Sequence, residues 1–275
     1  MAERWLELEW HGQRRRALLQ GSAGSGSPLI MALHGTGGTP RLMAKITGLT
    51  SRAPGFVLYP AALGESGSED PARGAAWNAG PGLGCPAFPD ADDAGFLRTL
   101  VERVCAGEVV DLSRVHLVGL SNGGRMAYRM ALEASDLFAS TAIVAGAWDG
   151  SGPAPARAVS TLIFHGTSDE HIPYEGGQGA KGRRVIHRPT PETAFAWAKV
   201  MGCVPKIQRS VLGAHHLDFA RGEDGTEVGL WTLQGQGHAW PGGRAWSASA
   251  DTPAADLDAT GLILDFFGHH PLERP

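Results

Sequence analysis

The sequence has few cysteines and none of the cysteine spacings that carry chemistry. Its 275 residues include three cysteines, Cys85, Cys105 and Cys203, with no C-x-x-C pair and no metal-ligand spacing. They predict neither a disulfide framework nor a cysteine-based metal site, although a single Cys85–Cys203 bridge stays open. Cys105 shares a helical face with three apolar residues, so we expect it in the core.

An excess of positive charge is also missing, as are long apolar runs. The net charge is −4 with acids and bases interspersed, which predicts no nucleic-acid partner. No stretch approaches the roughly 18 apolar residues of a membrane span. Charged residues occupy positions 1–16, where a signal peptide would have its apolar core. We therefore expect no membrane partner and a cytoplasmic protein, although a secreted chain whose leader had been removed would look the same.

What is present fits one globular domain, residues 1–275, with 43% apolar residues and a length that buries about 70–75% of the unfolded surface. Apolar strands alternate with helices, the pattern of a mostly parallel sheet flanked by helices. Residues 5–10 and 16–20 predict an antiparallel hairpin at its edge. A long Gly- and Pro-rich segment, 62–92, is a candidate binding loop. The expected strands are 28–33, 55–60, 115–120, 141–145, 161–164 and 228–233, and the expected helices 40–52, 93–106, 122–135, 191–201 and 262–267.

The most informative stretch is 115–135, in which an apolar strand runs into Gly119-Leu120-Ser121-Asn122-Gly123 and then a helical pattern. This is the pattern of a nucleophile elbow, a sharp strand-to-helix turn that presents one serine above the sheet edge. Glycines two residues before and after the serine remove side chains that would clash. The pattern predicts Ser121 as a nucleophile for acyl transfer.

A serine hydroxyl needs an imidazole to take its proton and a carboxylate to orient that imidazole. Strand 161–164 is followed by Asp169, and strand 228–233 is followed by His238. In α/β-hydrolases the order is serine, acid, histidine, each after a strand. We therefore expect Asp169 as the acid and His238 as the base, with Asp149 as the rival acid.

Two backbone N–H groups should form an oxyanion hole. One belongs to Asn122, directly after the nucleophile, and the second to Thr36 in the loop after strand 28–33. His34, next to that loop, suits a histidine that braces the backbone rather than a catalytic base.

Five segments together resemble a known family: HGTGGT, WN followed by DDAGFL, GLSNGGRMAY, FHGTSDEHIPYEGG and GHAWPGG. They are similar to the polyhydroxybutyrate depolymerase and feruloyl esterase group, often placed with carbohydrate esterase family one. The likeness covers residues 28–245 and implies an α/β-hydrolase fold without cofactor or metal. It implies Ser121, Asp169 and His238 as a catalytic triad.

The same resemblance implies Thr36 and Asn122 as oxyanion donors, and it suggests Trp77 and Trp240 as pocket residues, with core packing as the alternative. Asp92 and Asp93 fit a helix cap and a structural hydrogen-bonding pair. No H-E-x-x-H motif and no carboxylate-spaced cluster accompanies His171 or His215-His216, so these histidines predict no metal site. Residues 181–184 fit a solvated loop.

We expect a serine esterase acting on soluble or oligomeric esters of aromatic or short hydroxy acids. Insoluble polymer is disfavoured, since no polymer-binding module appears. An acyltransferase, a peptidase or an inactive binding protein remain alternatives, and the sequence does not indicate an oligomeric state.

Overall fold

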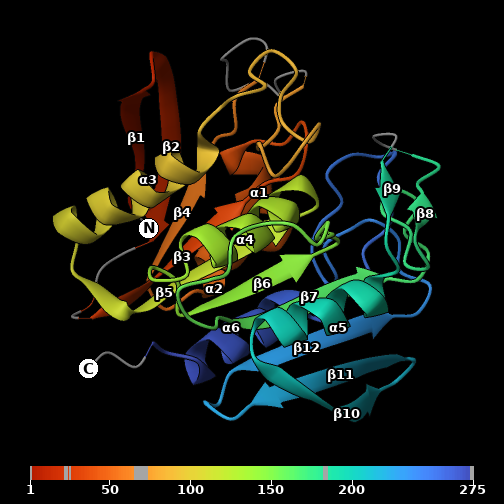
Figure 1. Ribbon diagram of the computed structural model, residues 1–275. Coiled ribbons are helices and arrows are strands. Elements are labelled where there is room, and N and C mark those ends of the chain that lie inside the picture. Colours follow the sequence, from red (N-terminus) through yellow and green to blue (C-terminus); the bar gives the residue numbers. More distant parts are fainter. Residues whose placement is uncertain (1, 22–23, 25, 65–73, 182–184, 273–275) are drawn as a thin grey trace.

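The computed structural model describes residues 2–21, 24, 26–64, 74–181 and 185–272, and it is built around one twisted sheet (Figure 1). Ten strands form that sheet in the order β1-β2-β4-β3-β5-β6-β7-β12-β11-β10. The six inner strands pair in parallel, and two antiparallel strands extend the sheet at either edge. This confirms the mostly parallel sheet. The inner strands are β4 (Phe56–Pro60), β3 (Ser27–Leu33), β5 (Val110–Leu120), β6 (Ser140–Val144), β7 (Ser160–Gly166) and β12 (Glu227–Leu233).

The expected N-terminal hairpin is present as β1 (Ala2–Trp10) and β2 (Gln13–Gly21), with β1 at the sheet edge. Its two turn residues, His11 and Gly12, both have positive φ, 49° and 74°. Such two-residue turns match the right-handed twist of the flanking strands. Strand β2 then pairs antiparallel with β4 and so joins the hairpin to the parallel strands.

Side chains of the inner strands alternate between two cores, one on each face of the sheet. In β3, Leu29, Met31 and Leu33 belong to one core, whereas Ile30 and Ala32 belong to the other. Every residue of β3 is buried, which explains why its sequence is apolar without alternation. Three helices cover the first face and three the second (Figure 1). They are α3 (Asp93–Gly107), α4 (Asn122–Glu133) and α5 (Thr190–Val200), then α1 (Pro40–Thr47), α2 (Leu49–Arg52) and α6 (Ala259–His269).

The helix boundaries follow from their caps. Thr39 caps α1, and the expected single helix over 40–52 breaks at Gly48, whose φ of 62° is left-handed. Asp92 caps α3 by accepting the N–H of Gly95, as expected. Asp93 is buried instead, where it pairs with Arg15 at 2.6 Å.

A second hairpin at the opposite edge was not anticipated. Strands β10 (Cys203–Leu212) and β11 (His215–Gly222) pair antiparallel with each other and then with β12. The available signal was Gly213, which forms the turn between these strands with φ 60°. A further small sheet pairs β8 (Gly177–Gln178) with β9 (Ile186–His187). It lies beside the cavity that contains Ser121, which His187 lines.

The strand order reverses direction between β3 and β5, because β4 lies on one side of this pair and β6 and β7 lie on the other. Loops leaving the carboxyl ends of β3 and β5 therefore diverge, which opens a crevice at a topological switch point. The nucleophile elbow follows β5 and the HGTGGT loop follows β3. Because β3 and β5 are neighbouring parallel strands, the two segments begin side by side at this edge of the sheet.

Cys85 and Cys203 are free thiols, so the Cys85–Cys203 bridge left open by the sequence is not formed. Cys203 is buried, and burial raises the pKa of its thiol to about 11. Cys105 is half-buried and packs against the core under α3. In the part of the chain that the structure describes, no helix is both long and apolar enough to cross a membrane.

Candidate active site

Ser121 lies at the tight turn between β5 and α4 in a conformation that few side chains adopt. Its φ is 58° and its ψ −118°, and holding a non-glycine residue there costs about 1–3 kcal/mol. A Cβ on Gly119 would lie 2.1 Å from the backbone oxygen of Gly123, and one on Gly123 would lie 2.2 Å from that of Leu33. Both flanking glycines are therefore required by close backbone approach.

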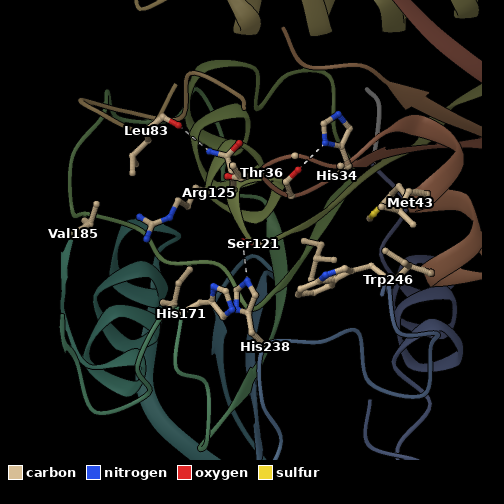
Figure 2. Close-up of a pocket in the computed structure, with 18 of the residues that line it drawn as sticks. His34, Thr36, Met43, Leu83, Ser121, Arg125, His171, Val185, His238 and Trp246 are labelled. Carbon is tan, nitrogen blue, oxygen red and sulfur yellow. Dashed lines mark hydrogen bonds between the residues drawn. The ribbon is translucent and has the colours of Figure 1, made fainter. Parts of the chain in front are cut away.

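A hydrogen-bond relay connects three of the expected residues. Ser121 Oγ lies 2.8 Å from His238 Nε2 (Figure 2). His238 Nδ1 in turn lies 2.7 Å from Asp169 Oδ2. Because Nδ1 faces a carboxylate, it carries the proton, and Nε2 accepts from the serine hydroxyl. The side chains expected as nucleophile, base and acid are thus linked by hydrogen bonds.

Asp169 is held as a buried carboxylate. Burial by itself would raise its pKa, but the hydrogen bond and charge of His238, the charge of His165 and the N–H of Ile172 together outweigh burial and lower it. Its other oxygen, Oδ1, accepts the N–H groups of His171 and Ile172 at 2.8 and 2.9 Å. The rival acid Asp149 is exposed and caps a turn through the N–H and hydroxyl of Ser151.

The acid and base loops are joined because β7 and β12 are parallel neighbours. Thr167 N–H donates to Leu233 O and Ser168 N–H donates to Gln236 O, both at 3.0 Å. A Cβ on Gly166 would lie 2.0 Å from Gln236 O. Beyond them, Asp251 Oδ2 accepts the N–H of His238 itself at 2.6 Å, a contact that the sequence did not reveal.

The loop after β3 packs directly against the serine. A Cβ on Gly35 would lie 3.1 Å from Ser121 Cβ, and Thr36 follows at the cavity wall. His34 braces this loop, since its Nδ1 donates to Gly35 O at 2.8 Å and its Nε2 accepts from Ala62 N–H at 3.1 Å. Burial lowers the pKa of His34 to about 4, so it stays neutral at neutral pH.

Trp77 differs from its expected place on the pocket wall. Its side chain is 0% exposed, and its indole N–H donates to His34 O at 2.9 Å. The Asn122 side chain holds the same segment by accepting Trp77 N–H at 2.7 Å and donating to Trp77 O at 3.1 Å. The motif WN therefore ties the HGTGGT loop to the start of α4 and does not line the pocket.

Trp240 also lies in the core, at 1% exposure. Its indole N–H donates to Thr260 Oγ1, whose hydroxyl donates to Thr47 O. The WPGG segment after His238 is thereby anchored to α6 and to the end of α1. Both tryptophans follow the core-packing alternative, because each has its N–H satisfied inside the protein.

The cavity beside Ser121 has a volume of about 450 Å³, within the usual range for small-molecule sites. Its apolar wall comes from Met43, Ile46 and Trp246, and the opposite wall includes Arg125 and His187. Figure 2 shows Met43 and Trp246 on one side of Ser121, with Arg125 and Val185 on the other. Sequence reasoning missed these wall residues, although Arg125 lies inside the GLSNGGRMAY motif.

His171 lies against the relay rather than in a metal site. Its ring stacks on His238 with centroids 4.5 Å apart. Burial, followed by the charge of His238, lowers its pKa. In the described ranges, no group of three or more His, Cys, Asp or Glu side chains is arranged to hold a metal ion.

The doubly wound sheet, the strained serine after its fifth strand and the relay at the carboxyl ends of its strands define an α/β-hydrolase. No family model matches the chain. Its sequence is 31% identical to feruloyl esterase B of Piromyces equi over 180 residues, which are 63% of this chain and 32% of that relative. The match thus spans about a third of that relative's length.

A second relative matches along most of both chains. The putative esterase NocK of Nocardia uniformis subsp. tsuyamanensis is 30% identical over 93% of this chain and 79% of the relative. The structure of an acetyl xylan esterase from Aspergillus awamori shares the fold, with a TM-score of 0.65 at 15% identity over 96% of this chain and 99% of that one. The match to NocK shows that the chain belongs to its family of esterases, which are carboxylic ester hydrolases of the α/β-hydrolase fold. The resemblance to the feruloyl esterase group is confirmed.

Proposed function

We propose that this chain hydrolyses carboxylic esters through a Ser121–His238–Asp169 triad and an acyl-enzyme, with residues 1–275 acting as one catalytic domain. The observation that carries the proposal is the relay of 2.8 and 2.7 Å from Ser121 Oγ to the Asp169 carboxylate. It opens onto a cavity of about 450 Å³.

The geometry supports a two-step mechanism. His238 Nε2 takes the Ser121 proton as Oγ attacks the ester carbonyl, and Asp169 stabilises the imidazolium that forms. His238 then returns the proton to the leaving alcohol, and the acyl-enzyme remains. A water molecule, activated by the same Nε2, releases the acid and restores Ser121.

The negative charge that develops on the carbonyl oxygen needs fixed donors. The backbone N–H groups of Thr36 and Asn122 are the proposed pair, because Thr36 borders the cavity and Asn122 begins α4. The positive end of the α4 dipole adds to them. In related chemistry, one such donor lowers the barrier by about 3–4 kcal/mol.

The proposed substrates are soluble esters of aromatic or short hydroxy acids. The support is the likeness to a feruloyl esterase and the cavity's apolar wall beside Ser121, which suits a small apolar group. The proposed mechanism on these substrates uses no cofactor.

The test is to treat the protein with a fluorophosphonate, measure its intact mass and map the adduct. Hydrolysis of methyl ferulate and of acetyl, butyryl and hydroxybutyrate esters is assayed in parallel. We expect one adduct on Ser121, and loss of both adduct and hydrolysis in Ser121→Ala. Ser168→Ala, which removes an exposed hydroxyl beside Asp169, should retain both. Labelling elsewhere, or hydrolysis that survives Ser121→Ala, would refute the proposal.

A further inference from the structure

The cavity at Ser121 has one permanently charged wall residue among those that the structure describes. Arg125, on α4, lines it with only 8% of its surface exposed, and the described lining residues include no Asp or Glu. A guanidinium in such a position is a fork of N–H donors that matches a carboxylate. An anionic group entering this cavity would therefore meet attraction and no described acidic side chain.

The orientation of Arg125 is set by its neighbours. Its Nη2 donates to His187 Nδ1 at 3.0 Å, and its Nη1 donates to Ala147 O at 3.4 Å. Burial, followed by the charge of Arg125, lowers the pKa of His187 to about 4. His187 is therefore neutral at pH 7, so that it positions the guanidinium without cancelling its charge.

Arg125 is also close to the reacting serine along the chain. It is the fourth residue of α4, directly behind the Ser121 turn, and four residues of helix rise by about 6 Å. Figure 2 shows its guanidinium on the side of the cavity opposite Met43 and Trp246, with Ser121 between them. An ester bound at Ser121 would place one arm on each side.

We propose that Arg125 makes this site selective for esters that carry a carboxylate on one arm and an apolar group on the other. The inference rests on the proposed ester hydrolysis at Ser121. The carboxylate pairs with the Arg125 guanidinium, and the apolar arm packs against Met43, Ile46 and Trp246. Arg125 is a specificity-determining residue in this scheme and takes no part in bond breaking.

The experiment uses two matched ester pairs and records kcat and KM by alkali titration. For the acyl arm, monoethyl succinate is compared with ethyl 4-methylpentanoate, which has an isopropyl group in place of the carboxylate. For the alcohol arm, 3-acetoxypropionate is compared with 3-methylbutyl acetate. Because the interaction is charge-assisted, we expect the anionic member of one pair to have a kcat/KM about tenfold or more above its partner.

Variants separate recognition from stability. Arg125→Gln should abolish the preference mainly by raising KM for the anionic ester, so that its kcat/KM falls about tenfold more than that of the neutral ester. Arg125→Lys should keep part of it, since the charge stays and the fork is lost. Arg129→Gln is the matched control, because Arg129 is on the same helix, pairs with Glu133 and lies outside this cavity.

Several results would overturn the inference. These are equal kcat/KM within both pairs, an equal loss for anionic and neutral esters in Arg125→Gln, or the same loss of preference in Arg129→Gln. If the unsubstituted protein hydrolyses neutral esters without preference, only the role of Arg125 is refuted. If it hydrolyses neither these esters nor methyl ferulate, the proposed function fails as well.

Discussion

The buried ion pair between Arg15 and Asp93 should control both stability and the loop beside the site. Arg15 lies in β2 and Asp93 opens α3; their side chains are 1% and 0% exposed and meet at 2.6 Å. The second Asp93 oxygen accepts the N–H of Asn78 at 2.6 Å, next to Trp77. Asp93→Ala therefore leaves the buried Arg15 guanidinium without its carboxylate. It also removes the acceptor that holds the Trp77-Asn78 segment in place.

The magnitude follows from the burial of the charge. Burial lowers the pKa of Arg15, and Asp93 only partly offsets this effect, so the cation is costly without its partner. Removing one member of such a pair costs about 3–5 kcal/mol. At about 2.1 cal/mol/K of unfolding entropy per residue, this cost lowers the Tm of the 275-residue chain by about 5–9 °C.

The assay is calorimetric melting with Asp136→Ala as the control. Asp136 forms a two-bonded pair with Arg98 at 2.6 and 2.9 Å, but their side chains are 55% and 34% exposed. An exposed pair contributes about 0–1 kcal/mol, so the control should melt within about 2 °C of the unsubstituted protein. Adding Arg15→Met to Asp93→Ala should restore part of the loss by removing the stranded charge. Equal melting of the two single variants, or no recovery in the double variant, would refute the reasoning.

Three further predictions concern the site and its pH range. Asp169→Asn should lower kcat by about 10⁴-fold, because an amide in place of the carboxylate no longer fixes the His238 tautomer, whereas Asp149→Asn should leave kcat nearly unchanged; comparable losses would refute the acid assignment. Gly123→Ala should cost about 1–3 kcal/mol and lower kcat, since the new Cβ would lie 2.2 Å from a backbone oxygen, while Gly107→Ala, with nothing within 4 Å, should do neither in urea titrations and ester assays. Because the pKa of His34 is lowered to about 4, the unfolded chain alone binds this proton between about pH 6.5 and 4, so the unfolding free energy should fall with falling pH by up to about 1.4 kcal/mol per unit from this group; His34→Gln should flatten that slope, and an unchanged slope would contradict the prediction.

The parallel sheet was predictable because burial on both faces leaves a continuous apolar run. Strands β3 and β7 have every residue buried, and the expected ranges 28–33 and 161–164 lie within them. The β10–β11 hairpin was not recognised, because several of its apolar residues, including Val204, Ile207 and Val211, point to solvent. An edge strand with exposed apolar side chains lacks the contrast between faces on which such predictions depend.

The relay residues were predictable for a related reason. Ser121, Asp169 and His238 each follow a parallel strand, and carboxyl ends of parallel strands meet at one edge of a sheet. Their chain order and strand context therefore determine their neighbourhood before any side chain is placed. The role of Asp251, which contacts His238 from 13 residues further on, depends on the path of a loop with no comparable periodic signal.

The cavity walls show that the tryptophan expected to line the pocket, Trp240, lies in the core, whereas Trp246 lines the cavity. Trp240 and Trp246 are six residues apart after His238, and both would suit a pocket by composition. Between them the chain turns at Gly242, whose φ is 70° and where a Cβ would lie 2.6 Å from Leu257 O. Before the turn, Trp240 is bonded to Thr260 in the core, and after it Trp246 lines the cavity. Composition indicates that an aromatic residue is near the site, but the left-handed turn at Gly242 separates the buried Trp240 from Trp246, which lines the cavity.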